Sequence, residues 1–134
     1  MKTFRQMLEE KNQSQSVLDE NMLFEMANIK KRDHPELPVN IYVSENPKVG
    51  HSARIKFQNN RTDRLTSMSD LIPMIISKNP IIPDEEDYNI KLKSKELNLI
   101  KKWIILNYDN LMLLWNNKIS EEKFLKVAKY DIEN

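Results

Sequence analysis

The sequence contains no cysteine, which excludes disulfide bonds, thiolate nucleophiles and zinc sites built on cysteine ligands. It contains a single glycine, Gly50. Loops that bind phosphate groups need several glycines because their backbone amides must close on the ligand. A P-loop and a dinucleotide-binding fingerprint are therefore both excluded.

Long hydrophobic runs and an excess of charge of one sign are also missing. The most apolar run, Trp103 to Leu106, is far too short to cross a bilayer. The first residues, MKTFRQMLEEKNQ, carry charges too early for a signal peptide, so we expect a cytoplasmic protein without membrane contact. The net charge of +1 predicts no long-range attraction to nucleic acid, so any such binding must depend on a local patch.

Two segments in the first half of the chain have the pattern of strands. Apolar and polar residues alternate over residues 39–44 and again over residues 52–58, which predicts two half-buried strands joined by a long hairpin connection. In the second strand Ala53, Ile55 and Phe57 are expected to face the core. The residues expected to face solvent there are Arg54, Lys56 and Gln58.

Two further segments are strand candidates. Residues 71–77 contain Pro73, which has no amide hydrogen, so this strand is expected at the edge of a sheet or at a bulge. Residues 88–93 are a candidate for a short fourth strand.

Helical spacing follows from residue 94 onwards. Ser94 is the expected N-cap, and residues 97–115 place a wide apolar surface on one side. A bend is expected at residues 107–110, where Asp109 is the candidate cap of a new turn. We expect both tryptophans, Trp103 and Trp115, in the core, and Leu99 and Leu106 at the margins of that surface. A last helix begins after the N-cap Ser120, with Ile119 and Phe124 at the spacing of a hydrophobic staple.

The N-terminal part is expected to be helical over residues 1–30, with apolar residues at helical spacing from Val17 to Ile29. These side chains either dock on the main body or pair with a second subunit as an arm. The expected fold class is α+β: an antiparallel sheet of three to four strands packed against C-terminal helices, with an N-terminal helical extension. Residues 1–30 and 31–134 are the two segments of one compact unit.

Few residues suggest catalysis or metal binding. His34 and His51 lie on separate loops without a carboxylate at fixed spacing, so we expect no metal site and no cofactor. The acidic run from Asp84 to Asp87 is interpreted as a solvated face, because adjacent carboxylates on an extended segment point in alternating directions. No catalytic residue is assigned.

A basic β-hairpin is the candidate binding site. Arg54 and Lys56 must share one face of a strand, and outward cations on two strands can meet phosphate groups. The same residue types also solubilise strands and protect sheet edges. The candidate residues are Lys48, His51, Arg54, Lys56, Arg61 and Arg64.

Five segments resemble a family of small uncharacterised proteins found in bacteriophages and bacterial mobile elements. The resemblance covers about residues 22 to 125, and Glu36 and Ala53 depart from the glycine and proline that the family tends to have there. It implies a setting in a bacterial host cell and no activity. The segments are FEMANI (24–29), LPVNIYV (37–43), ARIKF (53–57), ISKNPII (76–82) and WIILNYDNLMLLWNNKISEEKFL (103–125).

Three functions are therefore weighed. The first is a non-enzymatic protein of phage or mobile-element origin that binds a host protein or a protein–nucleic acid complex, for example as an anti-CRISPR inhibitor of a bacterial defence system. The second is a nucleic-acid-binding protein that uses the basic hairpin. The third is a small nuclease-like toxin that uses His51 with Arg54. The oligomeric state is open, and a homodimer is favoured if the N-terminal apolar segment does not fold back on the main body.

Overall fold

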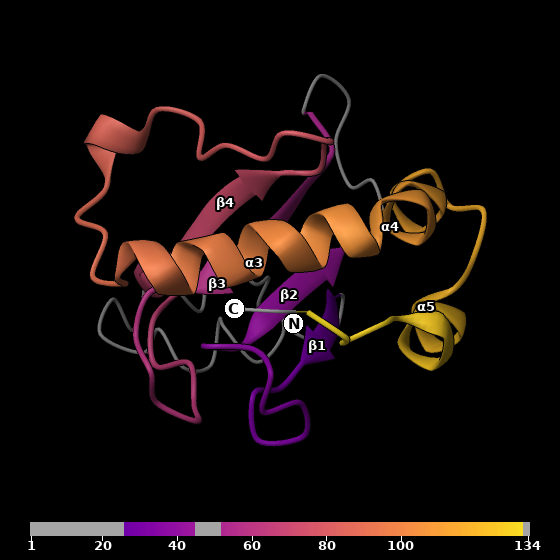
Figure 1. Ribbon diagram of the computed structural model, residues 1–134, viewed down its shortest axis with the longest axis horizontal. Helices are drawn as coiled ribbons and strands as arrows, with labels where there is room; N and C mark the ends of the chain where they lie inside the picture. The colour runs from indigo at the N-terminus through magenta and orange to yellow at the C-terminus, as the bar shows by residue number, and fades with distance from the viewer. Residues whose placement is uncertain (1–25, 45–51, 133–134) are drawn as a thin grey trace, which may run out of the picture.

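The computed structural model describes residues 26–44 and 52–132 of the chain (Figure 1). Four strands form one antiparallel sheet in the order of the sequence, and helices follow them, which confirms the predicted α+β fold. The strands are β1 (Met26–Ile29), β2 (Ile41–Ser44), β3 (Arg54–Gln58) and β4 (Leu71–Ile75). The helices are α3 (Ser94–Leu106), α4 (Tyr108–Trp115) and α5 (Glu121–Val127), with short 3-10 turns η1 (Met68–Asp70) and η2 (Glu85–Asp87).

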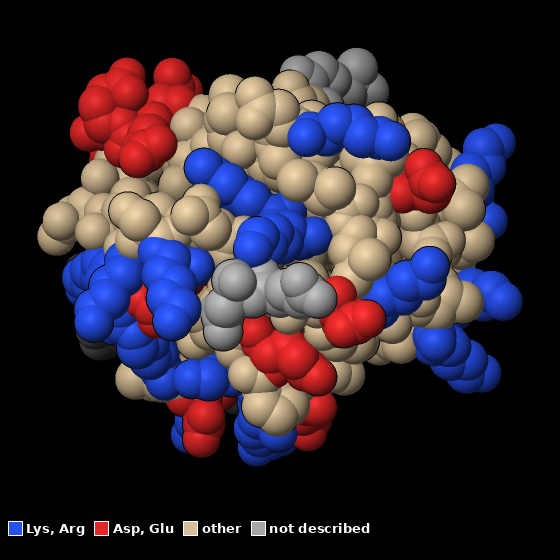
Figure 2. Space-filling view, viewed as in Figure 1, with Lys and Arg blue, Asp and Glu red and all other residues tan. Residues whose placement is uncertain are grey.

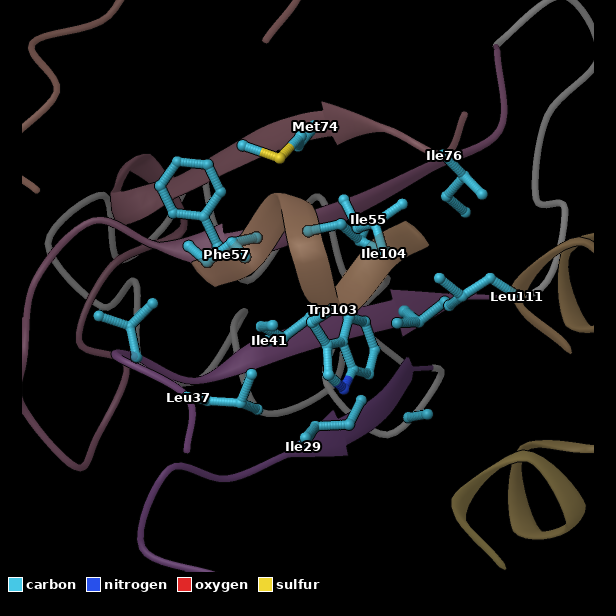
Figure 3. Packing of buried hydrophobic residues seen from close by; sticks show 14 of the residues in the cluster. Ile29, Leu37, Ile41, Ile55, Phe57, Met74, Ile76, Trp103, Ile104 and Leu111 are labelled. Atoms are coloured by element: carbon cyan, nitrogen blue, oxygen red, sulfur yellow. The ribbon is translucent and has the colours of Figure 1, made fainter. Parts of the chain in front are cut away.

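The core lies between the sheet and the three α-helices. Figure 1 shows α3 running across one face of the sheet, with α4 and α5 beyond its C-terminal end. From the strands, residues such as Ile55 and Phe57 point toward α3, and Trp103 of α3 meets them from the other side (Figure 3). The predicted alternation of β3 is therefore confirmed for its apolar residues.

Both tryptophans are core residues, as predicted. Trp103 has no exposed surface and Trp115 retains 6%. The ring of Phe124 from α5 meets Trp103 edge-on, with 6.2 Å between centroids and an interplanar angle of 81°. This geometry is favourable between aromatic rings, and it joins α5 to the layer formed by α3.

The end of the predicted N-terminal helical segment is a strand. Met26–Ile29 pairs with β2 in antiparallel register, with Ile29 opposite Ile41. Met26 and Ile29 have the spacing of one helix turn, but Ala27 and Ile29 also alternate, and pairing with β2 decides for the strand. The expected helices before residue 26, and their docking or pairing, lie outside the described residues.

The segment 88–93 is extended but is not a strand. Within it Leu92 is buried, while Asn89 and Lys91 are exposed. Its backbone is bound by the side chain of Asn59: Asn59 Nδ2 donates to the Asn89 carbonyl and the Lys91 amide donates to Asn59 Oδ1, both at 2.8 Å. A side-chain amide takes the place that a neighbouring strand would have.

Strand β4 lies at an edge of the sheet, as Pro73 predicted. It pairs with β3 alone, and Pro73 stands opposite Lys56. On the other side of β4, the Ile75 amide donates to the carbonyl of Ile81 at 2.9 Å, and the Leu71 amide donates to the Met68 carbonyl. Pro73 has no amide hydrogen to donate, so this edge of the sheet has few backbone donors to which a further strand could bind.

The helix boundaries agree with the sequence except in their capping residues. Ser120 caps α5, and its hydroxyl accepts a hydrogen bond from the Lys123 amide at 3.0 Å. At the start of α3 the N-cap is Lys93, one residue before the expected Ser94. The bend after α3 is at Asn107, within the expected residues 107–110, and the N-cap of α4 is Asn107 and not Asp109.

Candidate functional site

The structure describes four of the six residues of the predicted basic hairpin. Lys48 and His51 lie outside the described residues. Arg54 and Lys56 share one face of β3, as predicted, and both are partly buried. However, β3 lies between β2 and β4, so its cations belong to a central strand and not to a two-stranded ribbon. Arg54 Nε donates to the carbonyl of Ser52 at 3.1 Å.

Arg61 is bound to the first turn of α3. Its guanidinium donates to both carboxylate oxygens of Glu96, at 2.7 Å from Nε, and Glu96 also accepts the amide of Lys93 at 2.8 Å. The hydrogen bonds from Arg61 hold the pKa of Glu96 below its ordinary value against the opposing effect of burial. The same interaction raises the pKa of Arg61. Arg64, the last member of the set, is exposed.

Gln58 is the clearest correction to the predicted hairpin. It points away from Phe57, as the alternation requires, but it has no exposed surface because the loop that follows β3 folds over it. Its Oε1 accepts hydrogen bonds from Asn40 Nδ2 at 3.2 Å and from the Tyr42 hydroxyl at 3.1 Å. Its Nε2 donates to Asn60 Oδ1 at 2.7 Å and to the Thr62 carbonyl at 2.8 Å.

This polar network has a structural role. Asn40 extends it by accepting the Lys31 amide at 2.8 Å and donating to the Asp63 carbonyl at 3.2 Å. Each amide therefore has partners for both its oxygen and its nitrogen, which is what burial of such groups requires. The face of β2 and β3 that the sequence predicted to be solvated is closed at this end.

His34, the other histidine considered in the sequence analysis, packs against the residues that follow α5. Its ring stacks on the ring of Tyr130, with 3.8 Å between centroids and 6° between planes. Burial raises the pKa of Tyr130, and the charge of Glu36 acts in the same direction. His34 thus fixes the residues after α5 to the turn between β1 and β2.

The outward side of α3 carries several basic side chains. An open hollow of about 410 Å³ lies there, and the described residues that line it are Lys95, Asn98, Leu99, Lys101 and Lys102. Figure 2 shows Lys and Arg atoms over the centre of this face, at the position of α3 in Figure 1. Asp and Glu atoms gather at the upper left, where the exposed run Asp84–Asp87 includes η2, and others lie just below the centre of the face and at its right.

The apolar margins of α3 differ from the prediction. Leu99 is only partly buried and lines the hollow, while Ile105 and Leu106 are 45% and 36% exposed. Sequence reasoning assigned Leu99 and Leu106 to the core because an apolar surface that wide is usually covered. The sequence did carry a signal for a face that mixes lysines with apolar residues. At helical spacing, two lysines alternate with two leucines on one side of α3: Lys95, Leu99, Lys102 and Leu106.

No protein-family model matches this sequence, and comparisons with curated proteins and with solved structures find no significant match. Among residues 26–44 and 52–132, no group of three or more His, Asp and Glu side chains could hold a metal ion. Within the same ranges, no helix combines the length and the apolar character needed to cross a bilayer.

Proposed function

We propose that this chain is a non-enzymatic binding protein of bacteriophage or mobile-element origin that acts by contacting a macromolecule of its bacterial host. The observation that carries the proposal is the division of α3. Ile100, Trp103 and Ile104 are completely buried, whereas the opposite side presents lysines beside partly exposed apolar residues. A rigid helix with such an outer face is suited to contact a complementary partner.

The more specific form of the proposal is an inhibitor of a bacterial defence system, such as an anti-CRISPR protein. Its support is the resemblance of residues 22–125 to small phage and mobile-element proteins. An inhibitor of this kind can act by covering a surface of a host protein or of a protein–nucleic acid complex, and it needs no catalytic group of its own.

Affinity capture tests the general proposal. The full chain carrying a tag is incubated with bacterial lysate, and bound proteins are identified by mass spectrometry with excess untagged chain as competitor. We expect one host protein or complex to be enriched in near-stoichiometric amount and displaced by the competitor. Recovery of the tagged chain alone would overturn the proposal.

A phage or plasmid interference assay tests the specific form. Expression of the chain in a strain with an active CRISPR system is expected to restore plasmid transformation, and expression of an unrelated small protein serves as the control. If interference is unchanged while a host partner is still captured, the chain is a binding protein with a different target.

Binding to nucleic acid through β3 is the second candidate, and the shared face of Arg54 and Lys56 favours it. Phosphate contacts predict an affinity that falls steeply with salt and is lost when both residues are changed to Glu. Binding that is absent or insensitive to salt would remove this candidate. Cleavage of DNA or RNA that is lost in His51→Ala would instead support the nuclease-like alternative.

A further inference from the structure

The sheet has a second face, opposite to the one that α3 covers. Ile55 and Phe57 of β3 belong to the core beside α3. Their neighbours Arg54 and Lys56 point the other way, because successive side chains of a strand alternate, and the same alternation turns Tyr42 of β2 away from α3. The three α-helices that the structure describes all contribute to the core on the first face. The second face therefore needs another cover.

Apolar side chains on the second face are withdrawn from water. Met26 of β1 is 8% exposed, Tyr42 is 1% exposed and Leu71 of β4 is 7% exposed. They form a buried cluster with Leu65, against which Met68 packs. Leu65 and Met68 belong to the segment between β3 and β4, so this segment supplies part of the cover.

Other groups on this face are buried as well. Pro73, in the middle of the edge strand β4, is buried, and the side-chain oxygen of Asn28 on β1 is buried without a hydrogen-bond partner. Lys30 holds its amine 5.4 Å from the centre of the Tyr42 ring, and burial lowers its pKa, with the charge of Arg32 acting in the same direction. Two apolar residues from one loop are too few to cover a face of this width.

We infer that the N-terminal segment, residues 1–25, docks on the second face of the sheet, with its apolar residues against Tyr42 and Pro73 and its carboxylates beside the cations of that face. The segment lies outside the described residues, and its sequence gives its chemistry. It joins the described chain at Met26, whose side chain already belongs to the second face. The inference does not depend on the proposed function.

The composition of residues 15–25 complements this face. The stretch contains Asp19, Glu20 and Glu25 and no Lys or Arg, and nearly half of it is apolar. On the described strands, the residues that point to the second face include Arg54 and Lys56 and no Asp or Glu. Carboxylates and cations attract at short range, and apolar residues of the segment can remove the remaining apolar surface from water.

The segment is long enough and begins at the right place. Four strands spaced about 4.8 Å apart span roughly 15 Å. Residues 15–25 span about that distance even at a helical rise of about 1.5 Å per residue. They precede β1, which is an edge strand, so the chain has only to fold back across the sheet. Docking within one chain is favoured over docking of a second copy because the tether gives a high effective concentration.

Such docking makes the second face internal to the protein. Neither Tyr42 nor Lys56 is without an interaction partner in the structure, as a covered face requires. Arg54 and Lys56 would then be kept from phosphate groups in the intact chain. The outer side of α3 lies on the opposite side of the molecule and stays available.

Introduced cysteine pairs test this contact in the full chain, because the natural sequence has no cysteine. Met22→Cys is combined with Ile75→Cys, which is partly buried on the second face. The matched control combines Met22→Cys with Ile105→Cys, which is 45% exposed on α3. A short dimaleimide joins the thiols, and mass spectrometry measures the intramolecular product. The series is repeated with Leu18→Cys and Leu23→Cys in place of Met22→Cys.

We expect Ile75→Cys to be joined to at least one of the three segment positions about tenfold more efficiently than Ile105→Cys, because docking raises the effective concentration of the thiols. Circular dichroism of each variant must match that of the natural chain. Arg54→Cys, on the same face, replaces Ile75→Cys if that variant does not fold.

A stability measurement provides a second readout. Leu18→Asp together with Leu23→Asp is expected to lower the urea midpoint, and Leu113→Asp, at a position that is 40% exposed on α4, is expected to leave it nearly unchanged. Leu18→Ala with Leu23→Ala replaces the first variant if it does not fold.

Three results overturn the inference. The first is equal joining of the segment to Ile75→Cys and Ile105→Cys, or none to Ile75→Cys or Arg54→Cys from any of the three positions. The second is a urea midpoint that the changes at Leu18 and Leu23 do not lower. The third is joining between copies in a mixture of unlabelled and 15N-labelled chains, which would assign the segment to the face of a second copy.

Discussion

At the scale of single residues, buried amide side chains hold the irregular parts of this fold in place. Gln58 and Asn40 bind the loop after β3, Asn59 binds the segment 88–93, and Asn107 binds Lys129. An amide can donate and accept at once, so it can satisfy a backbone amide or carbonyl that has no partner in a sheet or a helix. These side chains supply the hydrogen bonds that a helix or a sheet would otherwise give to the backbone.

Replacing Gln58 by Leu is expected to destabilise the protein by roughly 2–4 kcal/mol, because buried partners such as Asn40 Nδ2 and the Tyr42 hydroxyl lose their acceptor. The free energy of unfolding in urea measures the effect. Asn98→Ala on the exposed side of α3 is the control, with an expected change within about 0.5 kcal/mol. A Gln58→Leu protein as stable as the natural one would show that the network contributes nothing.

The ion pair between Arg61 and Glu96 makes stability depend on acid pH. The folded-state pKa of Glu96 lies below its ordinary value, so the unfolded chain takes up a proton first as the pH falls. The contribution of Glu96 is therefore present at neutral pH and is lost as the pH drops from the ordinary carboxylate range through the folded-state pKa. We expect the urea midpoint of Glu96→Gln to depend less on pH in this range than the midpoint of the natural chain does. Glu122 forms an exposed ion pair with Lys126, and Glu122→Gln is expected to leave the pH dependence of the midpoint unchanged.

At the scale of elements, one residue links the two longest helices to the C-terminal segment. Asn107 stands between α3 and α4, and its Nδ2 donates to the carbonyls of Trp103 and Lys129, each at 2.9 Å. Its Oδ1 accepts the Lys129 amide at 2.7 Å. The bend between the helices and the path of the chain after α5 thus depend on the same buried side chain.

Changing Asn107 to Ala is expected to cost roughly 2–3 kcal/mol, because a buried acceptor and a buried donor are lost together. Amide exchange at Lys129, followed by mass spectrometry, is expected to accelerate more than exchange within α3. Asn116→Ala is the matched control, since its side chain also bonds four residues back, to Met112, but at an exposed position. Equal effects of the two changes would contradict the role assigned to Asn107.

The sequence predicted the presence of elements better than their pairing. The alternation in 39–44 and 52–58 predicted two strands that the structure has, and the apolar segment 71–77 was a third candidate that the structure also has, at the edge that Pro73 allowed. The fourth strand is Met26–Ile29, not 88–93, although both are extended. A strand needs a partner at the right distance, and a local pattern holds no information about which segment will supply it.

At the scale of the whole molecule, the larger of two buried apolar clusters includes residues from all four strands and all three α-helices that the structure describes. Trp103 lies near its centre, and Phe124 from the last helix is in contact with it. A small domain built on one core is expected to unfold in one cooperative step, so tryptophan fluorescence and circular dichroism should report the same transition.

Phe124→Ala tests whether α5 belongs to that cooperative unit. Loss of this buried ring is expected to cost about 3–5 kcal/mol, and both spectroscopic signals should shift together to lower urea. Leu125→Ala is the control, because Leu125 is next in sequence but 43% exposed. An early change in circular dichroism, with tryptophan emission unaffected, would show instead that α5 unfolds separately.

The sequence by itself determined that Ile55 and Phe57 of β3, and Ile100, Trp103 and Ile104 of α3, face the core. The period of the apolar residues is a local property that any packing must respect. The tertiary structure decided what covers the opposite sides. Gln58 is buried because a loop folds over it, and Leu106 is exposed because the neighbouring helix bends away at Asn107. The ion pair between Arg61 and Glu96 likewise depends on the tertiary structure, since contacts between distant segments form only when the chain has folded.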